Sequence, residues 1–158
     1  SNIIINGGGH NAAAGFTLDK TNLKNFEDFM LEDFSNTGVS KNSSFTYDAE
    51  VSSLALNIDF FTEIKKLEPF GTGNPLPTFL LKDLKIIKTK IIDNKHISLI
   101  LKSRTGLSIK SISFNSVNNK VGQYLLNYKN NLSVIGQINE NIWNNKRTLQ
   151  LTIRDVII

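Results

Sequence analysis

Hydrophobic residues in the first half of the chain recur at three- and four-residue spacing, as on one face of an α-helix. One such face predicts a helix over residues 20–34, and it consists of Leu23, Phe26, Phe29, Met30 and Phe34. A second helix is predicted around residues 60–67, and it ends before Pro69 because proline cannot continue a helix. The polar residues 35–44 predict a loop between them, and residues 47–51 are expected to be extended.

Beyond residue 80 the hydrophobic period changes from helical to strand-like. Five β-rich runs are predicted, at residues 84–92, 96–102, 107–114, 132–139 and 148–157. A helix is expected between the third and fourth runs, at about residues 117–128. Five strands with a helix in this place are typical of an OB barrel, and another small barrel or sandwich stays open as an alternative.

The first of these runs has an internal change of phase. Its even positions are apolar at Leu84 and Ile86 but are lysines at 88 and 90. Since successive side chains in a strand point to opposite faces, the change predicts a β-bulge or a sharp bend, which small barrels need.

A proline- and glycine-rich segment, LEPFGTGNPLPTF, occupies residues 67–79 between the helical and strand-like parts. All three prolines of the chain lie here, so it can be neither helix nor central strand. We interpret the segment as a rigid joint, with Phe70 and Phe79 as anchors at its two ends.

Charge divides the chain at about the same place. Residues 1–70 contain 5 lysines and 10 acidic residues, a net charge of −5, whereas residues 71–158 contain 10 lysines and 3 arginines against 4 acidic residues, a net charge of +9. A basic unit of this kind favours a polyanionic partner, although a solvated lysine-rich surface explains the composition equally well.

Composition excludes several functions. With 40% hydrophobic and 20% charged residues, the chain is typical of a globular protein, and the absence of cysteine removes disulfides, Cys-based zinc sites and thiol catalysis. It also fits a cytoplasmic protein, and no apolar run approaches the ~18 residues of a membrane span. The two histidines are far apart and no carboxylate cluster is evident, so we expect no catalytic residues, metal or other cofactor in this segment.

Two groups of residues are candidates for binding. Gly8 and Gly9 precede a predicted helical turn over residues 10–14, which His10 begins. Glycine backbone before a helix start can bind phosphate, although a plain glycine turn is the more frequent case. In the predicted barrel, the expected DNA contacts are Lys88, Lys90, Lys95, Lys102, Arg104, Lys110, Trp143, Lys146 and Arg147. Trp143, the only tryptophan, either stacks on a base or packs against the barrel end.

These motifs resemble those of a known family. Residues 7–15, GGGHNAAAG, are similar to the GG-H-x-x-A-A-G motif of the DHHA1 domain of DHH phosphoesterases, and residues 67–79 resemble the segment that leads into the OB domain in the RecJ branch. The resemblance implies an α+β chain: the end of a DHHA1 α/β domain with helices over residues 1–55, a helix and rigid joint over 56–80, and a five-stranded OB-like barrel over 81–158.

The resemblance also implies a function. RecJ proteins are 5′-to-3′ exonucleases for single-stranded DNA in recombination and repair, and their Mn²⁺ or Mg²⁺ ions are held by a DHH domain that has no counterpart here. We therefore expect a segment of a longer protein, inactive alone, in which Gly8, Gly9 and His10 face substrate phosphates and the barrel binds the strand. Ser1-Asn2 is then expected to be a cloning remnant.

Two alternatives stay open. The basic barrel could dock the acidic tail of a partner such as a single-strand DNA-binding protein. The chain could also belong to a DHH phosphodiesterase acting on short oligonucleotides or cyclic dinucleotides, against which the joint and the attached barrel argue.

Overall fold

The computed structural model describes residues 3–11, 13–36, 45–143 and 146–158, with the side chains of Trp143 and Lys146 excepted. The chain folds as two compact units, residues 1–44 and 45–158. Within the described ranges, no helix combines the length and the apolar composition that crossing a bilayer requires.

The first unit is a hairpin followed by a helix. Strands β1 (Ile4–His10) and β2 (Ala13–Leu18) pair antiparallel, and a 3-10 turn (Lys20–Asn22) leads into α1 (Leu23–Asn36). The predicted helix is thus confirmed. It extends two residues beyond the expected end, and residues 37–44 of the predicted loop lie outside the described residues.

The predicted helical turn over residues 10–14 is wrong, because His10 ends β1 and Ala13 and Ala14 begin β2. Three alanines are too few to nucleate a helix, and cross-strand pairing offers the backbone its hydrogen bonds instead. Gly9 lies opposite Ala14, where a Cβ on Gly9 would come within 2.7 Å of the Ala13 carbonyl oxygen. Close strand approach, rather than a helix start, therefore requires this glycine.

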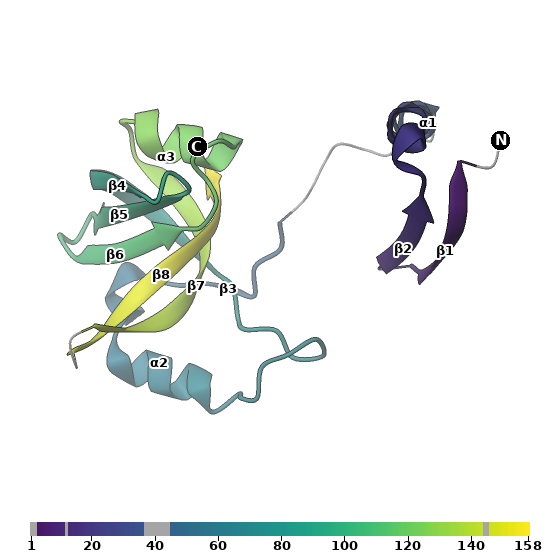
Figure 1. Cartoon of the computed structure of the whole chain (residues 1–158). Helices are drawn as coiled ribbons and strands as arrows, with labels where there is room; N and C mark the ends of the chain where they lie inside the picture. The colour runs from purple at the N-terminus through teal and green to yellow at the C-terminus, as the bar shows by residue number, and fades with distance from the viewer. Residues whose placement is uncertain (1–2, 12, 37–44, 144–145) are drawn as a thin grey trace. The chain divides into compact units, whose positions relative to one another are not determined.

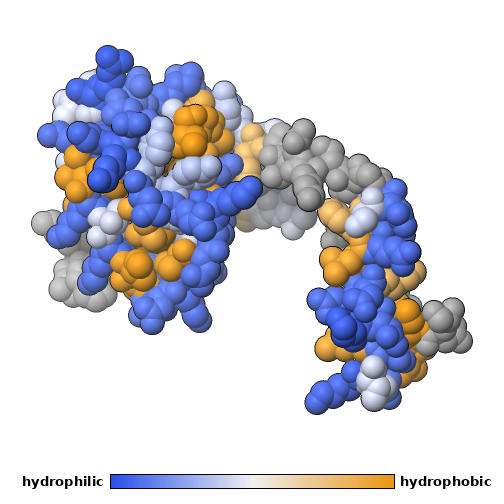
Figure 2. Space-filling view, turned by 90° about the horizontal axis from the view of Figure 1, so that it is seen from above, coloured by the Kyte–Doolittle hydropathy of each residue, from blue (hydrophilic) through white to orange (hydrophobic). Residues whose placement is uncertain are grey.

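Hydrophobic side chains of the first unit stay in contact with solvent. None of its described residues is buried, and Phe16, Phe29 and Met30 are each about half exposed. Figure 2 shows hydrophobic residues interspersed with hydrophilic ones over this unit. Its described residues therefore form no core, and the Phe16–Phe26 ring contact at 4.6 Å joins the hairpin to α1.

The second unit is built on a closed barrel (Figure 1). Its strands are β4 (Phe79–Ile92), β5 (His96–Ser103), β6 (Ser108–Ser113), β7 (Leu132–Trp143) and β8 (Lys146–Ile157). The order is β4-β5-β6-β8-β7, closed by antiparallel pairing of β7 with β4, while β6 and β8 pair parallel. The five predicted strands and their order along the chain are confirmed.

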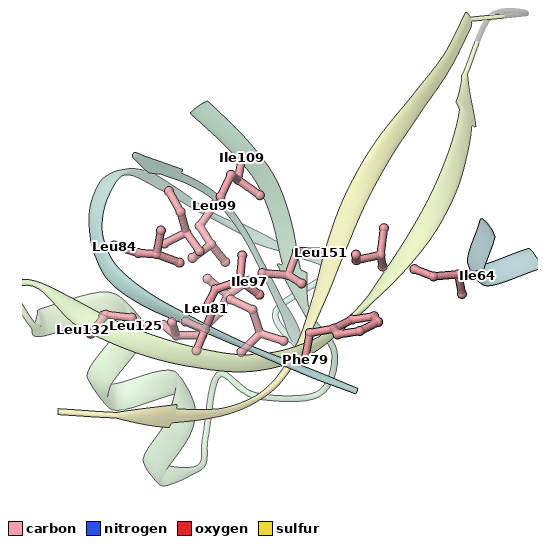
Figure 3. Packing of buried hydrophobic residues seen from close by; sticks show 14 residues of the cluster. Ile64, Phe79, Leu81, Leu84, Ile97, Leu99, Ile109, Leu125, Leu132 and Leu151 are labelled. Atoms are coloured by element: carbon pink, nitrogen blue, oxygen red, sulfur yellow. The ribbon is translucent and has the colours of Figure 1, made fainter. Parts of the chain in front are cut away.

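Helices cover the two ends of the barrel. The helix α3 (Lys120–Asn127) joins β6 to β7 and inserts Leu125 at one end, and α2 (Ile58–Lys65) contributes Ile64 at the other (Figures 1 and 3). Between them, the inward positions of the strands form one hydrophobic cluster with Leu81 and Leu101 near its centre. A five-stranded closed barrel with its helix between the third and fourth strands is the OB arrangement.

The predicted bulge lies in β4. Ile86 is opposite Leu101 and Lys88 is opposite Ile100, so Ile87 is an extra residue without a partner on β5. Before Ile87 the even residues Leu84 and Ile86 face the core, and after it the odd residues Thr89 and Ile91 lie opposite the buried Leu99 and Ile97. The bulge therefore turns Lys88 outward, as the change of phase in the sequence indicated.

The proline-rich segment is packed onto the barrel. Phe79 is buried in the core and Phe70 packs against it, which confirms the two expected anchors. The Asn74 side-chain amide donates to the carbonyl oxygens of Leu67 and Pro69, at 2.7 and 3.1 Å. Gln137 on β7 donates to the Leu76 carbonyl oxygen at 2.9 Å, which fixes the segment to the barrel wall.

The residues before the joint also pack with the barrel. Strand β3 (Ala49–Glu50) pairs parallel with the start of β4, and the 3-10 turn Ser53–Ala55 follows it. The compact unit therefore begins at Phe45 and includes the joint. The predicted assignment of residues 1–55 to a DHHA1 domain stays a prediction.

Core packing predicts a large effect for Leu101→Ala. Leu101 is 0% exposed, so the replacement leaves a cavity and is expected to lower the free energy of unfolding by about 2–5 kcal/mol. Ile142→Ala, at a site 58% exposed, is the control, with an expected change within about 0.5 kcal/mol. Denaturant unfolding followed by circular dichroism measures both, and equal effects would contradict the assigned core.

Candidate nucleic-acid interface

Five lysines share the outer face of the sheet formed by β4, β5 and β6. The register forms three cross-strand rows on this face: Lys85–Lys102–Ser108, Lys88–Ile100–Lys110 and Lys90–Ser98–Ile112. The inward neighbours in the same strands, among them Leu99, Leu101 and Ile109, are buried. We call this set, Lys85, Lys88, Lys90, Lys102 and Lys110, the lysine face.

The lysine face has no acidic counterpart. Among the described residues, none of its five ammonium groups lies within ion-pair distance of a carboxylate, and all five side chains are exposed. Lys82, by contrast, is 2.6 Å from Glu50, whose hydrogen bond and charge raise the pKa of the lysine. The lysine face is therefore a local excess of positive charge.

Two lysines of this face oppose each other directly. Lys85 on β4 and Lys102 on β5 are cross-strand partners, and directly opposed side chains have Cβ atoms about 4.5–5.5 Å apart. Like charges in this position destabilise a sheet. An anionic ligand would remove this repulsion, which favours a binding role for the face.

A groove extends the basic surface toward α3. It measures about 520 Å³ and lies between the β4 bulge and the end of α3, where its lining includes Lys85, Ile87, Lys88, Tyr128 and Lys129. Its floor contains partly exposed apolar groups, and its basic residues come from segments about 40 positions apart in the sequence. Such a mixture of apolar and cationic groups suits a nucleic-acid strand.

The predicted contacts in turns are separated from one another. Lys95 lies in the β4–β5 turn, and Arg104 lies in the β5–β6 turn at the other end of β5, 3.4 Å from Asp83. Arg147 is the second residue of β8 and lies 3.6 Å from Glu140 on β7. Both arginine side chains are more than 70% exposed, so these ion pairs contribute little stability and can exchange for phosphate.

The remaining predicted residues are not brought to this face by the described structure. Trp143 and Lys146 pair at the tip of the β7–β8 hairpin, but their side chains lie outside the described residues. Gly8, Gly9 and His10 belong to the other unit.

Sequence reasoning missed Lys85 and Lys129. Lys85 precedes the bulge and has the opposite parity to Lys88, so alternation alone did not group them. Its position opposite Lys102 could have been found by aligning the two predicted strands about their turn with one extra residue at the predicted bulge. Nothing local marks Lys129, because only the packing of α3 brings it to the groove.

The strand order and the helix position define an OB-fold barrel, and its outer face is basic. Residues 47–155 match the family described as the RecJ OB domain. The chain therefore belongs to the RecJ OB domain family.

Relatives and solved structures agree with this assignment. The single-stranded-DNA-specific exonuclease RecJ of Bacillus subtilis (strain 168) is 26% identical over 162 aligned positions, covering 99% of this chain and 20% of the relative. Crystal structures of RecJ from Thermus thermophilus with Mg²⁺ and with Mn²⁺ match at TM-scores of 0.64 and 0.65 and 23% and 22% identity, covering 99% and 98% of this chain. The chain spans about a fifth of the length of these proteins.

Repulsion within the lysine face predicts a measurable coupling. Lys85→Thr should stabilise the protein more when Lys102 is present than in a Lys102→Thr background, by about 0.2–1 kcal/mol at low salt. The double-mutant cycle cancels the different strand propensities of Thr and Lys. Unfolding curves at low and high salt measure the coupling, which should shrink as salt screens the charges. A coupling of zero at low salt would show that the two ammonium groups do not interact.

Proposed function

We propose that this chain is the strand-binding C-terminal portion of a RecJ-like exonuclease that hydrolyses single-stranded DNA in the 5′-to-3′ direction during recombination and repair. The carrying observation is the lysine face on the outer surface of β4, β5 and β6. OB barrels bind single strands on the corresponding strands and the neighbouring loops.

Charge and chemistry support a single strand as the ligand. The face presents lysines in successive rows, with Ile100 and Ile112 exposed in part between them. Ammonium groups bind phosphates without reading sequence, and apolar groups between them accept bases of any identity. Lys95, Arg104, Lys146, Arg147 and Trp143 extend this interface in the proposal, through the turns at its margins.

The metal ions of the longer enzyme are assigned elsewhere. Among the described residues, no three His, Asp or Glu side chains gather where they could hold a metal ion. Relatives are solved with Mg²⁺ and Mn²⁺, and we propose that the longer enzyme uses one of them in its DHH domain.

Gly8, Gly9 and His10 are proposed to contact a substrate phosphate in that enzyme. The support is the family resemblance and the bare backbone of the hairpin. Gly8 and Gly15 are cross-strand partners, and nothing lies within 4 Å of the position that a Cβ would take on either residue. A phosphate can therefore approach the backbone of this pair closely.

A second candidate function is docking of an acidic protein tail. Where β6 and β8 separate, an apolar pocket of about 210 Å³ lies beside Lys110 and is lined by Leu56, Leu107 and Leu149 among others. An acidic tail with an apolar side chain, such as that of a single-strand DNA-binding protein, would fit both features. A pull-down with nuclease-treated partner, with and without its tail, tests this.

Binding of a labelled oligothymidine at several salt concentrations tests the proposed function. Affinity should fall steeply with salt, and Lys88→Ala/Lys110→Ala should reduce the slope of log affinity against log salt by about 1.4, because each phosphate contact contributes about 0.7. Lys20→Ala/Lys24→Ala, which removes two exposed lysines of the first unit, is the matched control and should leave the slope unchanged. Salt-insensitive binding, or equal effects of the two double variants, would contradict the proposed interface.

The chain alone is expected to be inactive as a nuclease. Hydrolysis in the proposal needs the metal ions of the DHH domain, so incubation of 3′-labelled single strands with Mn²⁺ should leave the labelled strand at its full length. The longer enzyme under the same conditions is the positive control. Metal-dependent degradation that copurifies with the chain through successive columns would overturn this assignment.

A further inference from the structure

A solvent-exposed aromatic ring lies at the edge of the lysine face. Phe114 directly follows β6, whose outward positions are Lys110 and Ile112 and whose inward positions Ser111 and Ser113 are buried. Alternation therefore places Phe114 on the same side as Lys110. The residue is 55% exposed, although phenylalanine gains most from burial.

The Phe114 ring is held in place rather than free to collapse onto the barrel. Its edge-to-face contact with His96 has a centroid distance of 5.2 Å and an interplanar angle of 75°. The backbone N–H of Asn115 donates to Nδ1 of His96 at 2.9 Å, and Asn115 has a left-handed φ of 51°. His96 thus fixes both the ring and the backbone that follows it.

Cationic residues belong to the elements next to this ring. The loop after Phe114 is tied to the β4–β5 turn by the Val117 N–H, which donates to the Lys95 carbonyl oxygen at 3.3 Å. Lys90 lies opposite Ser98, which is two residues along β5 from His96. The ring also borders a pocket of about 110 Å³ with Arg154 in its lining, so space remains beside it.

We propose that Phe114 is a base-stacking platform for a nucleobase of a single strand whose phosphates contact Lys90 and Lys95. This inference rests on the proposed function and adds to it a named contact with the base. An exposed ring held by an edge contact leaves a face for stacking, and every base offers a π-face to it. The site therefore accepts any base and requires that a base be present.

Comparison of Phe114→Ala with Phe45→Ala tests the proposal in the intact chain. Phe45 is 52% exposed and lies outside the lysine face, so it matches the residue type and exposure of Phe114. Phe114→Ala should weaken binding of oligothymidine about tenfold, within the range measured for loss of one base–aromatic stack. Phe45→Ala should leave the affinity unchanged.

A second ligand isolates the stacking contribution. An oligonucleotide of the same length with abasic sites throughout keeps its phosphates, so Phe114→Ala should bind it as the unchanged protein does. The slope of affinity against salt should also be the same with and without Phe114, because the ring makes no phosphate contact. Phe114→Trp should bind oligothymidine at least as well as the unchanged protein.

The outcomes separate this inference from the proposed function. If the unchanged chain fails to bind oligothymidine, the result overturns both the proposed function and the stacking site. If the chain binds with its steep salt dependence but Phe114→Ala binds equally well, only the stacking site is overturned, and Phe114 packs against His96 without touching DNA. An equal loss on the abasic strand, or a loss that Phe114→Trp does not restore, would also overturn it.

Discussion

One extra residue in β4, Ile87, decides which side of the barrel wall the lysines of that strand occupy. The strand has two partners, β7 along its first part and β5 along its second, and closure of the barrel requires it to bend between them. A register irregularity between Leu81 and Leu84 lies at this change of partner, and the bulge at Ile87 reverses the inward parity of the residues beyond it. Without it, Lys88 and Lys90 would point into the hydrophobic core, and the core and the lysine face could not exist together.

The shape of the segment that leads into the barrel depends on a few polar side chains. Asn74 closes the proline-rich turn through two backbone carbonyl groups, and Gln137 bridges that segment to β7 while its carbonyl oxygen accepts from Arg154 at 2.9 Å. The prolines make the segment stiff, but the hydrogen bonds of Asn74 and Gln137 fix its position on the barrel. The motif that carries the family resemblance is thus part of the barrel unit.

The lysine face destabilises the free protein. Unpaired ammonium groups repel one another, whereas a surface shaped for stability alone would intersperse carboxylates, as Glu50 does beside Lys82. The aromatic pair Phe114 and His96 at its edge keeps an apolar ring in water. Both features have the same physical explanation under the proposal, since a polyanion with stacked bases relieves the repulsion and covers the ring.

The sequence by itself determined the helices, the five strands, the bulge and the division of charge, because these follow from local periodicity and composition. It misassigned residues 10–14, where three alanines suggested a helix but pairing of Ala13 and Ala14 with His10 and Gly9 across the hairpin decided the structure. Only the tertiary structure placed Lys85 opposite Lys102, brought Lys129 to the same groove, and separated the unpaired lysines from Arg104 and Arg147 with their acidic partners. These residues become neighbours through strand register and through packing between distant segments. Neither can be inferred from a short stretch of the sequence.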